Sequence, residues 1–85
     1  MKDHLPITTQ TRYFEYLRDV RIANGMTLTE VSRASQIGDD ERTKVPLPVL
    51  SKIEHGKIRV PSITTVIKIS RGYGIPLDTL KLFFL

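Results

Sequence analysis

The chain has 85 residues, a net charge of +4 and no cysteine. This length is enough for one small domain, and the lack of cysteine excludes disulfide bonds as a source of its stability. Apolar residues never form a run of about 18, which excludes a membrane-spanning helix and predicts a soluble, cytoplasmic protein.

The first part of the chain joins an irregular end to a helical pattern. Residues 1–8 are polar and contain a proline, so we predict a flexible N-terminal arm. Apolar residues then recur with a helical period, and the pair Asn24-Gly25 is a typical helix end. We therefore predict a first helix at 10–24, within a folded domain that covers 9–85.

A second helix is predicted at 27–37, because Thr27 and Glu30 have the spacing of a capping box. In this motif each side chain accepts a hydrogen bond from the backbone N–H of the other residue. The residues that follow are almost all charged and have no apolar period. They predict a solvated loop at 38–45.

The third helix is predicted at 46–55. Pro46 and Pro48 fit only in its first turn, where their missing N–H groups would have no partner anyway. Leu50 and Ile53 are three residues apart and share an inward face. The polar residues between and after them are left on the outer side, and a glycine ends the helix.

Two more helices complete the pattern. The helix predicted at 62–73 has a broad apolar stripe that includes Ile63 and Ile67, and the last helix, at 77–84, has Leu77 facing inward. No stretch alternates like a strand. The predicted fold class is therefore all-α, a bundle of five short helices.

Positive charge gathers around the third helix. From residue 42 to 59 the sequence has five basic residues and one acidic residue, Glu54. This cluster favours a polyanionic partner such as a nucleic acid. With only two histidines, His4 and His55, no metal or cofactor site is expected. His55 beside Glu54 has no nucleophile near it in the sequence, so we do not expect an enzyme.

Four segments, in this order and spacing, resemble the Cro/repressor-type helix-turn-helix family, the lambda-repressor-like DNA-binding domains. They are Leu17-x-x-Val20-Arg21-x-x-x-Gly25-Met26-Thr27, Leu50-Ser51-x-Ile53-Glu54-x-Gly56-Lys57, Pro61-Ser62-Ile63-x-x-Val66-Ile67-x-Ile69 and Tyr73-Gly74-Ile75-Pro76-Leu77-Asp78-x-Leu80. The resemblance covers residues 17–80. It implies a compact five-helix domain that regulates transcription in a prokaryote or a phage.

The resemblance also implies roles for individual residues. The third helix would lie in the major groove of double-stranded DNA, with its outer residues against the bases: Leu47, Pro48, Val49 and Lys52. The smaller Ser51 would reach a phosphate or only pack. Other residues would contact phosphates: Lys57, Arg59, Thr27, Lys44 and Arg42. Arg21 and Glu54 would form an ion pair between the first and third helices. The position of Arg21 beside the apolar face of its helix agrees, because a partly buried guanidinium needs a carboxylate.

Three features depart from the family's pattern. The base-facing positions carry two aliphatic residues and a proline, Leu28 occupies a position where a polar residue often contacts phosphate, and residues 39–44 lengthen the connection before the third helix. DNA could still be read through thymine methyl groups and a guanine contact from Lys52, or mainly through its shape. The alternative function is a protein-interaction module that keeps the fold and binds a protein through its apolar outer side.

Several residues have a simpler interpretation. Lys52 can be solvated instead of bound to a base, and the loop with Arg42 and Lys44 can be filler. The apolar C-terminal segment Leu82–Leu85 predicts a homodimer, a cap on the bundle, or a chain that continues beyond it.

Overall fold

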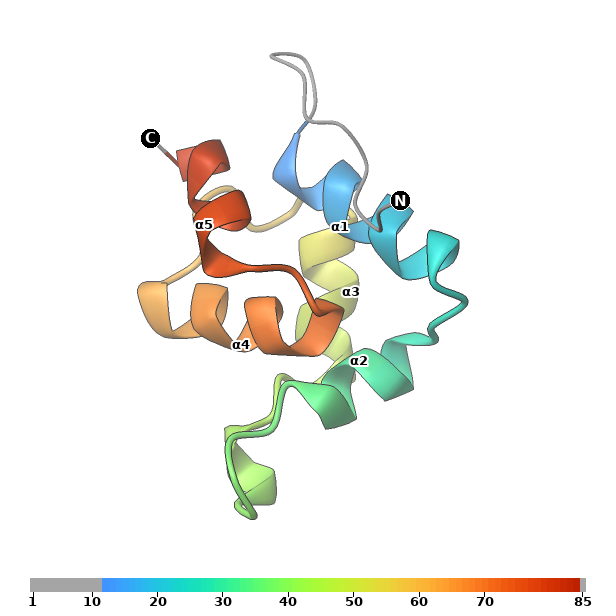
Figure 1. The fold of residues 1–85 in the computed structure, drawn as a ribbon, viewed down its shortest axis with the longest axis vertical. Helices are drawn as coiled ribbons and strands as arrows, with labels where there is room; N and C mark the ends of the chain where they lie inside the picture. The colour runs from blue at the N-terminus through green and yellow to red at the C-terminus, as the bar shows by residue number, and fades with distance from the viewer. Residues whose placement is uncertain (1–11, 85) are drawn as a thin grey trace.

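The computed structural model describes residues 12–84 (Figure 1). The α-helices are α1 (Tyr13–Ala23), α2 (Leu28–Ala34), α3 (Leu47–Glu54), α4 (Ile63–Tyr73) and α5 (Leu77–Leu80), with 3₁₀ helices at Glu41–Thr43 and Lys81–Phe84. Within the described residues there is no β-strand, only an isolated bridge between Ile37 and Asp40. The predicted all-α fold of five helices is confirmed. The predicted arm at 1–8 lies outside the described residues.

Local sequence signals set where the helices begin. Thr27 Oγ1 accepts a hydrogen bond from Glu30 N at 3.1 Å, and Glu30 Oε1 accepts one from Thr27 N at 2.8 Å, so the capping box forms. Ser62 Oγ accepts a bond from Thr65 N at 3.2 Å at the start of α4. Pro46 is the N-cap of α3. The side-chain oxygens of Thr27 and Ser62 accept hydrogen bonds from N–H groups that have no partner inside a helix.

α2 ends earlier than the sequence predicts. The capping and apolar pattern predicts a helix up to residue 37, whereas α2 ends at Ala34. Ile37 N donates to Thr43 Oγ1 at 2.7 Å instead of to a carbonyl of α2. The chain then forms an excursion, residues 36–44, which we call the insertion. It contains a 3₁₀ helix, and it projects from the rest of the domain in Figure 1.

The C-terminal part of the predicted helix at 77–84 winds as a 3₁₀ helix, with two aromatic rings against α1. The ring centroids of Phe83 and Tyr16 are 5.3 Å apart, and those of Phe84 and Tyr13 are 5.2 Å apart. Each aromatic pair of this kind contributes about 0.5–1.5 kcal/mol beyond its buried area. The rings therefore close the bundle over α1.

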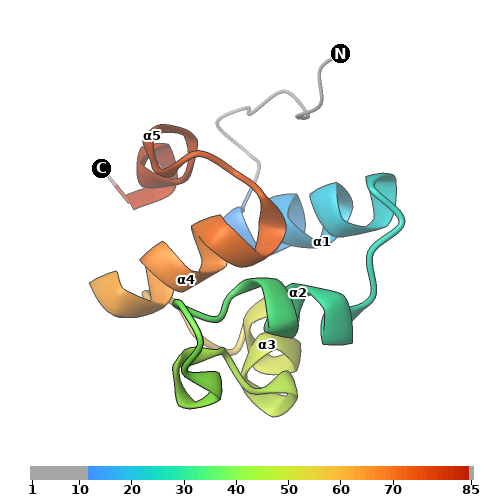
Figure 2. The same ribbon diagram turned by 60° about the horizontal axis from the view of Figure 1, so that its bottom comes forward.

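The five α-helices pack around one core (Figures 1 and 2), and each of them contributes side chains to it. Its most deeply buried aliphatic members are Leu17, Val31, Leu50, Ile53, Ile69 and Leu80. α2 and α4 come closest at Gly72, where an added Cβ atom would lie 2.8 Å from the backbone oxygen of Val31. A glycine is needed here because any side chain would push the two helices apart.

Three apolar side chains that the sequence predicts to face inward lie at the surface. Ile63 is 73% exposed, Leu77 42% and Ile67 39%. α4 packs against α1, α2 and α5, and these helices leave part of its apolar pattern uncovered, so its buried stripe is narrower than that pattern suggests. Val66 and Ile69 belong to the part of that pattern that is buried.

Candidate nucleic-acid interface

α3 has a buried side and an exposed side. Leu50 and Ile53 are buried in the core, whereas Pro48 and Lys52 are exposed and Leu47 is 43% exposed. In Figure 2, α3 lies beside α2 at the lower edge of the domain. The exposed residues show that the rest of residues 12–84 leaves the outer side of α3 uncovered.

Two of the predicted DNA-binding residues of α3 lie differently from the others. Val49 is half-buried and packs against the core. Ser51 is also half-buried, and its backbone oxygen accepts a hydrogen bond from His55 Nδ1 at 2.7 Å. Because residues four and three apart share a helix face, the exposed row of α3 runs through Pro48 and Lys52 to His55. Val49, predicted to face outward, is mainly a packing residue.

Glu54 is held by two side chains at the end of α3. Arg21 of α1 donates from Nε to Glu54 Oε2 at 2.8 Å and from Nη2 to Oε1 at 3.0 Å. Tyr73 of α4 donates from its hydroxyl to Oε2 at 2.6 Å. The Glu54 side chain is only 4% exposed, and a carboxylate so deeply buried requires such donors. The predicted pair is present, and Tyr73 adds a third helix to it.

Both donors keep their protons at neutral pH. The hydrogen bond to Glu54 raises the pKa of the Arg21 guanidinium above its usual value. Burial, and then the hydrogen bond to Glu54, raise the pKa of the Tyr73 hydroxyl far above its usual value. The end of α3 is therefore fixed to α1 and α4 by bonds that do not titrate near neutral pH, and Arg21 neutralises the one acidic side chain of this helix.

Basic residues follow α3 directly. Gly56 has φ +74°, the left-handed conformation in which a helix ends most easily on glycine. Lys57 and Arg59 are exposed just beyond it. Within residues 12–84, neither side chain forms an ion pair with a carboxylate. Both are available to an anionic ligand.

The basic residues of the insertion are already paired. Arg42 donates from Nε to Asp40 Oδ1 at 3.1 Å and from Nη2 to Oδ2 at 3.2 Å, and Arg42 lowers the pKa of the Asp40 carboxyl through these bonds. Lys44 Nζ lies 3.8 Å from Glu41 Oε1. The insertion therefore offers little free positive charge to DNA.

The start of α2 combines a cap with a core residue. Thr27 is exposed, and its hydroxyl oxygen caps the helix. Leu28 is half-buried and packs against the core. Its apolar character, a departure from the family's pattern, is thus explained by packing.

Ser32 in α2 and Ser35, directly after it, fix where α3 begins. The sequence analysis did not identify either serine. Ser32 Oγ donates to Val45 O at 2.6 Å, and Val45 N donates to Ser35 Oγ at 2.8 Å. Ser35 Oγ also donates to Ser32 O at 2.6 Å, and all three residues are buried. This serine clamp brings both ends of the insertion together at α2. Its one signal in the sequence is a pair of serines, three residues apart, at the buried side of a short helix.

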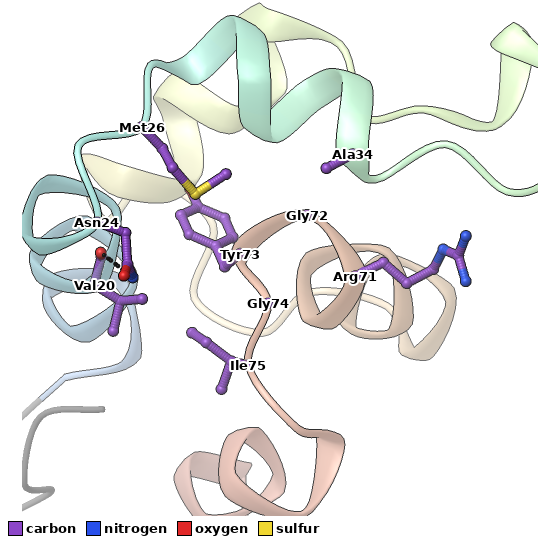
Figure 3. A pocket seen from close by; sticks show the side chains of 9 residues that line it. All are labelled: Val20, Asn24, Met26, Ala34, Arg71, Gly72, Tyr73, Gly74 and Ile75. Carbon is purple, nitrogen blue, oxygen red and sulfur yellow. Dashed lines mark hydrogen bonds between the residues drawn. The ribbon is translucent and has the colours of Figure 1, made fainter. Parts of the chain in front are cut away.

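A hollow of about 430 Å³ opens between α1, α2 and the end of α4. Figure 3 shows Asn24 at one side of it, donating to the Val20 carbonyl at 2.9 Å, and Arg71 pointing away on the other side. The titratable side chains of its lining are Arg71 and Tyr73. Since the Tyr73 hydroxyl is bonded to Glu54, these residues do not form an acid–base pair in the hollow.

Two kinds of site are not found among residues 12–84. No group of three or more His, Asp or Glu side chains there is placed to hold a metal ion. In the same part of the chain, none of the helices combines the length and the apolar character needed to cross a bilayer.

Comparison with known proteins gives a family match. A family model described as helix-turn-helix matches residues 17–80 of the chain. No curated protein and no solved structure matches the chain.

Proposed function

Because the chain belongs to the Cro/repressor-type helix-turn-helix family, whose members are DNA-binding regulators, we propose that it regulates transcription in a prokaryote or a phage by binding duplex DNA with α3 in the major groove. The observation that carries this proposal is the uncovered outer side of α3, which ends next to the unpaired basic residues Lys57 and Arg59.

Base contacts come from the exposed row of α3. Lys52 is long enough to reach guanine O6 and N7, and Leu47 offers methyl groups to a thymine methyl. Pro48 adds apolar surface but no donor. Such a row makes few hydrogen bonds with base edges. We therefore infer that DNA shape contributes much of the specificity.

Phosphate contacts come mainly from Lys57 and Arg59. Lys44 and Arg42 would have to leave Glu41 and Asp40 before binding a phosphate. We assign them a smaller role than the free residues that follow α3. Thr27 can still donate its hydroxyl proton to a phosphate, because the cap uses only its oxygen as an acceptor.

Lys57→Ala is expected to weaken duplex binding and to lower the salt dependence of the binding constant by about one unit, because one fewer phosphate releases its counterion. Lys52→Ala should instead relax sequence preference at one position. The measurement is selection of duplexes from a random pool, followed by fluorescence titrations over a range of salt concentrations. Lys68→Ala, which removes an equal charge from α4, is the control.

Failure of the wild-type chain to bind any duplex at low salt would contradict the DNA-binding proposal. The protein-interaction module would then be the remaining candidate. In that case Leu47→Asp should abolish capture of the partner protein, because Leu47 is the most exposed aliphatic side chain of α3.

We propose further that two copies of the chain associate through an apolar face beside the C-terminal segment. Val60 is 77% exposed and Ile63 73%, and together with Leu77 and Phe84 they line a hollow of about 430 Å³. Leu82 is also exposed. Phe83 and Phe84 are half-buried against the same chain, and Leu85 lies outside the described residues. The face therefore extends from the predicted segment to the start of α4.

Ile63→Asp is expected to convert a dimer into a monomer, because a carboxylate would be buried without a partner in the interface. The readout is the mass from sedimentation velocity at tens of micromolar protein. Thr64→Asp, on the neighbouring exposed residue of α4, is the matched control and should stay dimeric. A wild-type chain that sediments as a monomer would rule out this interface.

A further inference from the structure

Another hollow, about 550 Å³ in volume, lies where the start of α1 meets the exit of α3. We call it the basic cleft. Three of its lining residues carry nitrogen donors and the others are aromatic or glycine: Arg12, His55, Arg59, Tyr13, Phe14, Phe83 and Gly56. No acidic residue lines it. The cleft thus combines aromatic rings with two guanidinium groups and an imidazole.

The walls of the basic cleft are held together by contacts between distant segments. The Tyr13 hydroxyl donates to the backbone oxygen of Ile58, which ties α1 to the chain after α3. Phe14 lies so close to Gly56 that an added Cβ atom would be 3.0 Å from its ring. Burial raises the pKa of the Tyr13 hydroxyl, so this bond persists at neutral pH. The cleft is therefore already formed in the free protein.

Two of the polar side chains have fixed orientations. The Arg12 guanidinium carbon lies 5.9 Å from the centre of the Phe14 ring, and an arginine placed over an aromatic ring keeps its N–H donors free for an anion. His55 Nδ1 is used by Ser51 O, which leaves Nε2 for a ligand. Glu15 Oε1 is 3.4 Å from the Arg12 backbone nitrogen and so faces the start of α1.

The charge and the position of the cleft together identify its ligand. Within residues 12–84, neither Arg12 nor Arg59 forms an ion pair. The N–H donors of a guanidinium group form a planar fork that matches the geometry of phosphate oxygens. The cleft adjoins the exit of α3, and in helix-turn-helix complexes the DNA backbone borders the groove that holds the recognition helix.

We propose that the basic cleft binds one phosphate of the DNA backbone, with Arg12 and Arg59 as its ligands and His55 beside them. This inference rests on the proposed function and adds a contact from α1 to the surface of α3. Arg12 is exposed at the edge of the domain, so it can be replaced without disturbing the core.

The test compares wild type with Arg12→Gln, Arg59→Gln and the charge-matched control Lys68→Gln, on α4, with one selected duplex. Arg12→Gln is expected to make the slope of log K against log salt concentration less steep by about 0.9. This change corresponds to about an eightfold loss of affinity at 0.1 M salt. A set of duplexes with one neutral methylphosphonate linkage each then locates the phosphate. One linkage should weaken the binding of wild type more than it weakens the binding of either arginine variant.

The outcomes separate this inference from the proposed function. If wild type binds the duplex while Arg12→Gln behaves like Lys68→Gln, the cleft does not bind a phosphate and the role of α3 is unaffected. If the two arginine variants lose sensitivity at different linkages, a shared phosphate is excluded. Absence of duplex binding by wild type would overturn both this inference and the proposed function. Thermal melting confirms that each variant is folded.

Discussion

Arg21→Leu is expected to destabilise the domain by about 3–5 kcal/mol, because it leaves the buried Glu54 carboxylate without its cation. The hydroxyl of Tyr73 would remain as the main donor to this carboxylate. A small domain has only about 5–15 kcal/mol of stability in total. The variant is therefore expected to be close to unfolding at 37 °C. Urea denaturation of wild type and variant at 25 °C measures the difference.

The double variant Arg21→Leu, Glu54→Gln is the decisive control. Glutamine removes the buried charge and keeps an oxygen that can accept the Tyr73 hydrogen bond, so most of the lost stability should return. If the double variant is no more stable than Arg21→Leu, the loss arises from packing around Arg21 and not from the isolated carboxylate.

Ser35→Ala is expected to destabilise the domain by about 1–3 kcal/mol, because it leaves the buried Val45 N–H without an acceptor. Ser32→Ala should have a similar effect through the Val45 carbonyl. The loss of duplex affinity should be larger than the loss of stability. Val45 directly precedes α3, so release of the serine clamp changes how α3 is presented, and duplex affinity should fall more than tenfold in the double variant while it is still folded.

Circular dichroism melts and duplex titrations at a temperature where all variants are folded give the two measurements. Thr64→Ala, which removes an exposed hydroxyl from α4, is the control. A double variant with normal affinity would show that packing of α3 on α1 and α2, and not the serine clamp, orients the helix.

Much of the fold follows from local signals in the sequence. The capping box of Thr27 and Glu30 and the apolar period of each helix depend on residues within one or two turns, so they can be recognised without tertiary information. The ion pair of Arg21 and Glu54 was predicted from the family resemblance and from the need of a partly buried guanidinium for a carboxylate.

Other features depend on neighbours that are distant in the sequence. The end of α2 depends on Thr43, whose Oγ1 accepts the hydrogen bond from the Ile37 N–H that would otherwise continue the helix. The exposure of Ile63 depends on how much of α4 its neighbours cover. Val49 is half-buried because the third helix packs with that side against the core. None of these outcomes leaves a pattern in the nearby residues.

The sequence by itself determined the helices, their caps, the all-α class and the concentration of basic residues around α3, because hydrogen bonding within a turn and the period of apolar residues act locally. Only the tertiary structure decided which basic residues are free and which are paired, that Ser32 and Ser35 hold the chain before α3, and that Arg12 meets Arg59 in one cleft. These depend on contacts between segments that come together only when the core forms.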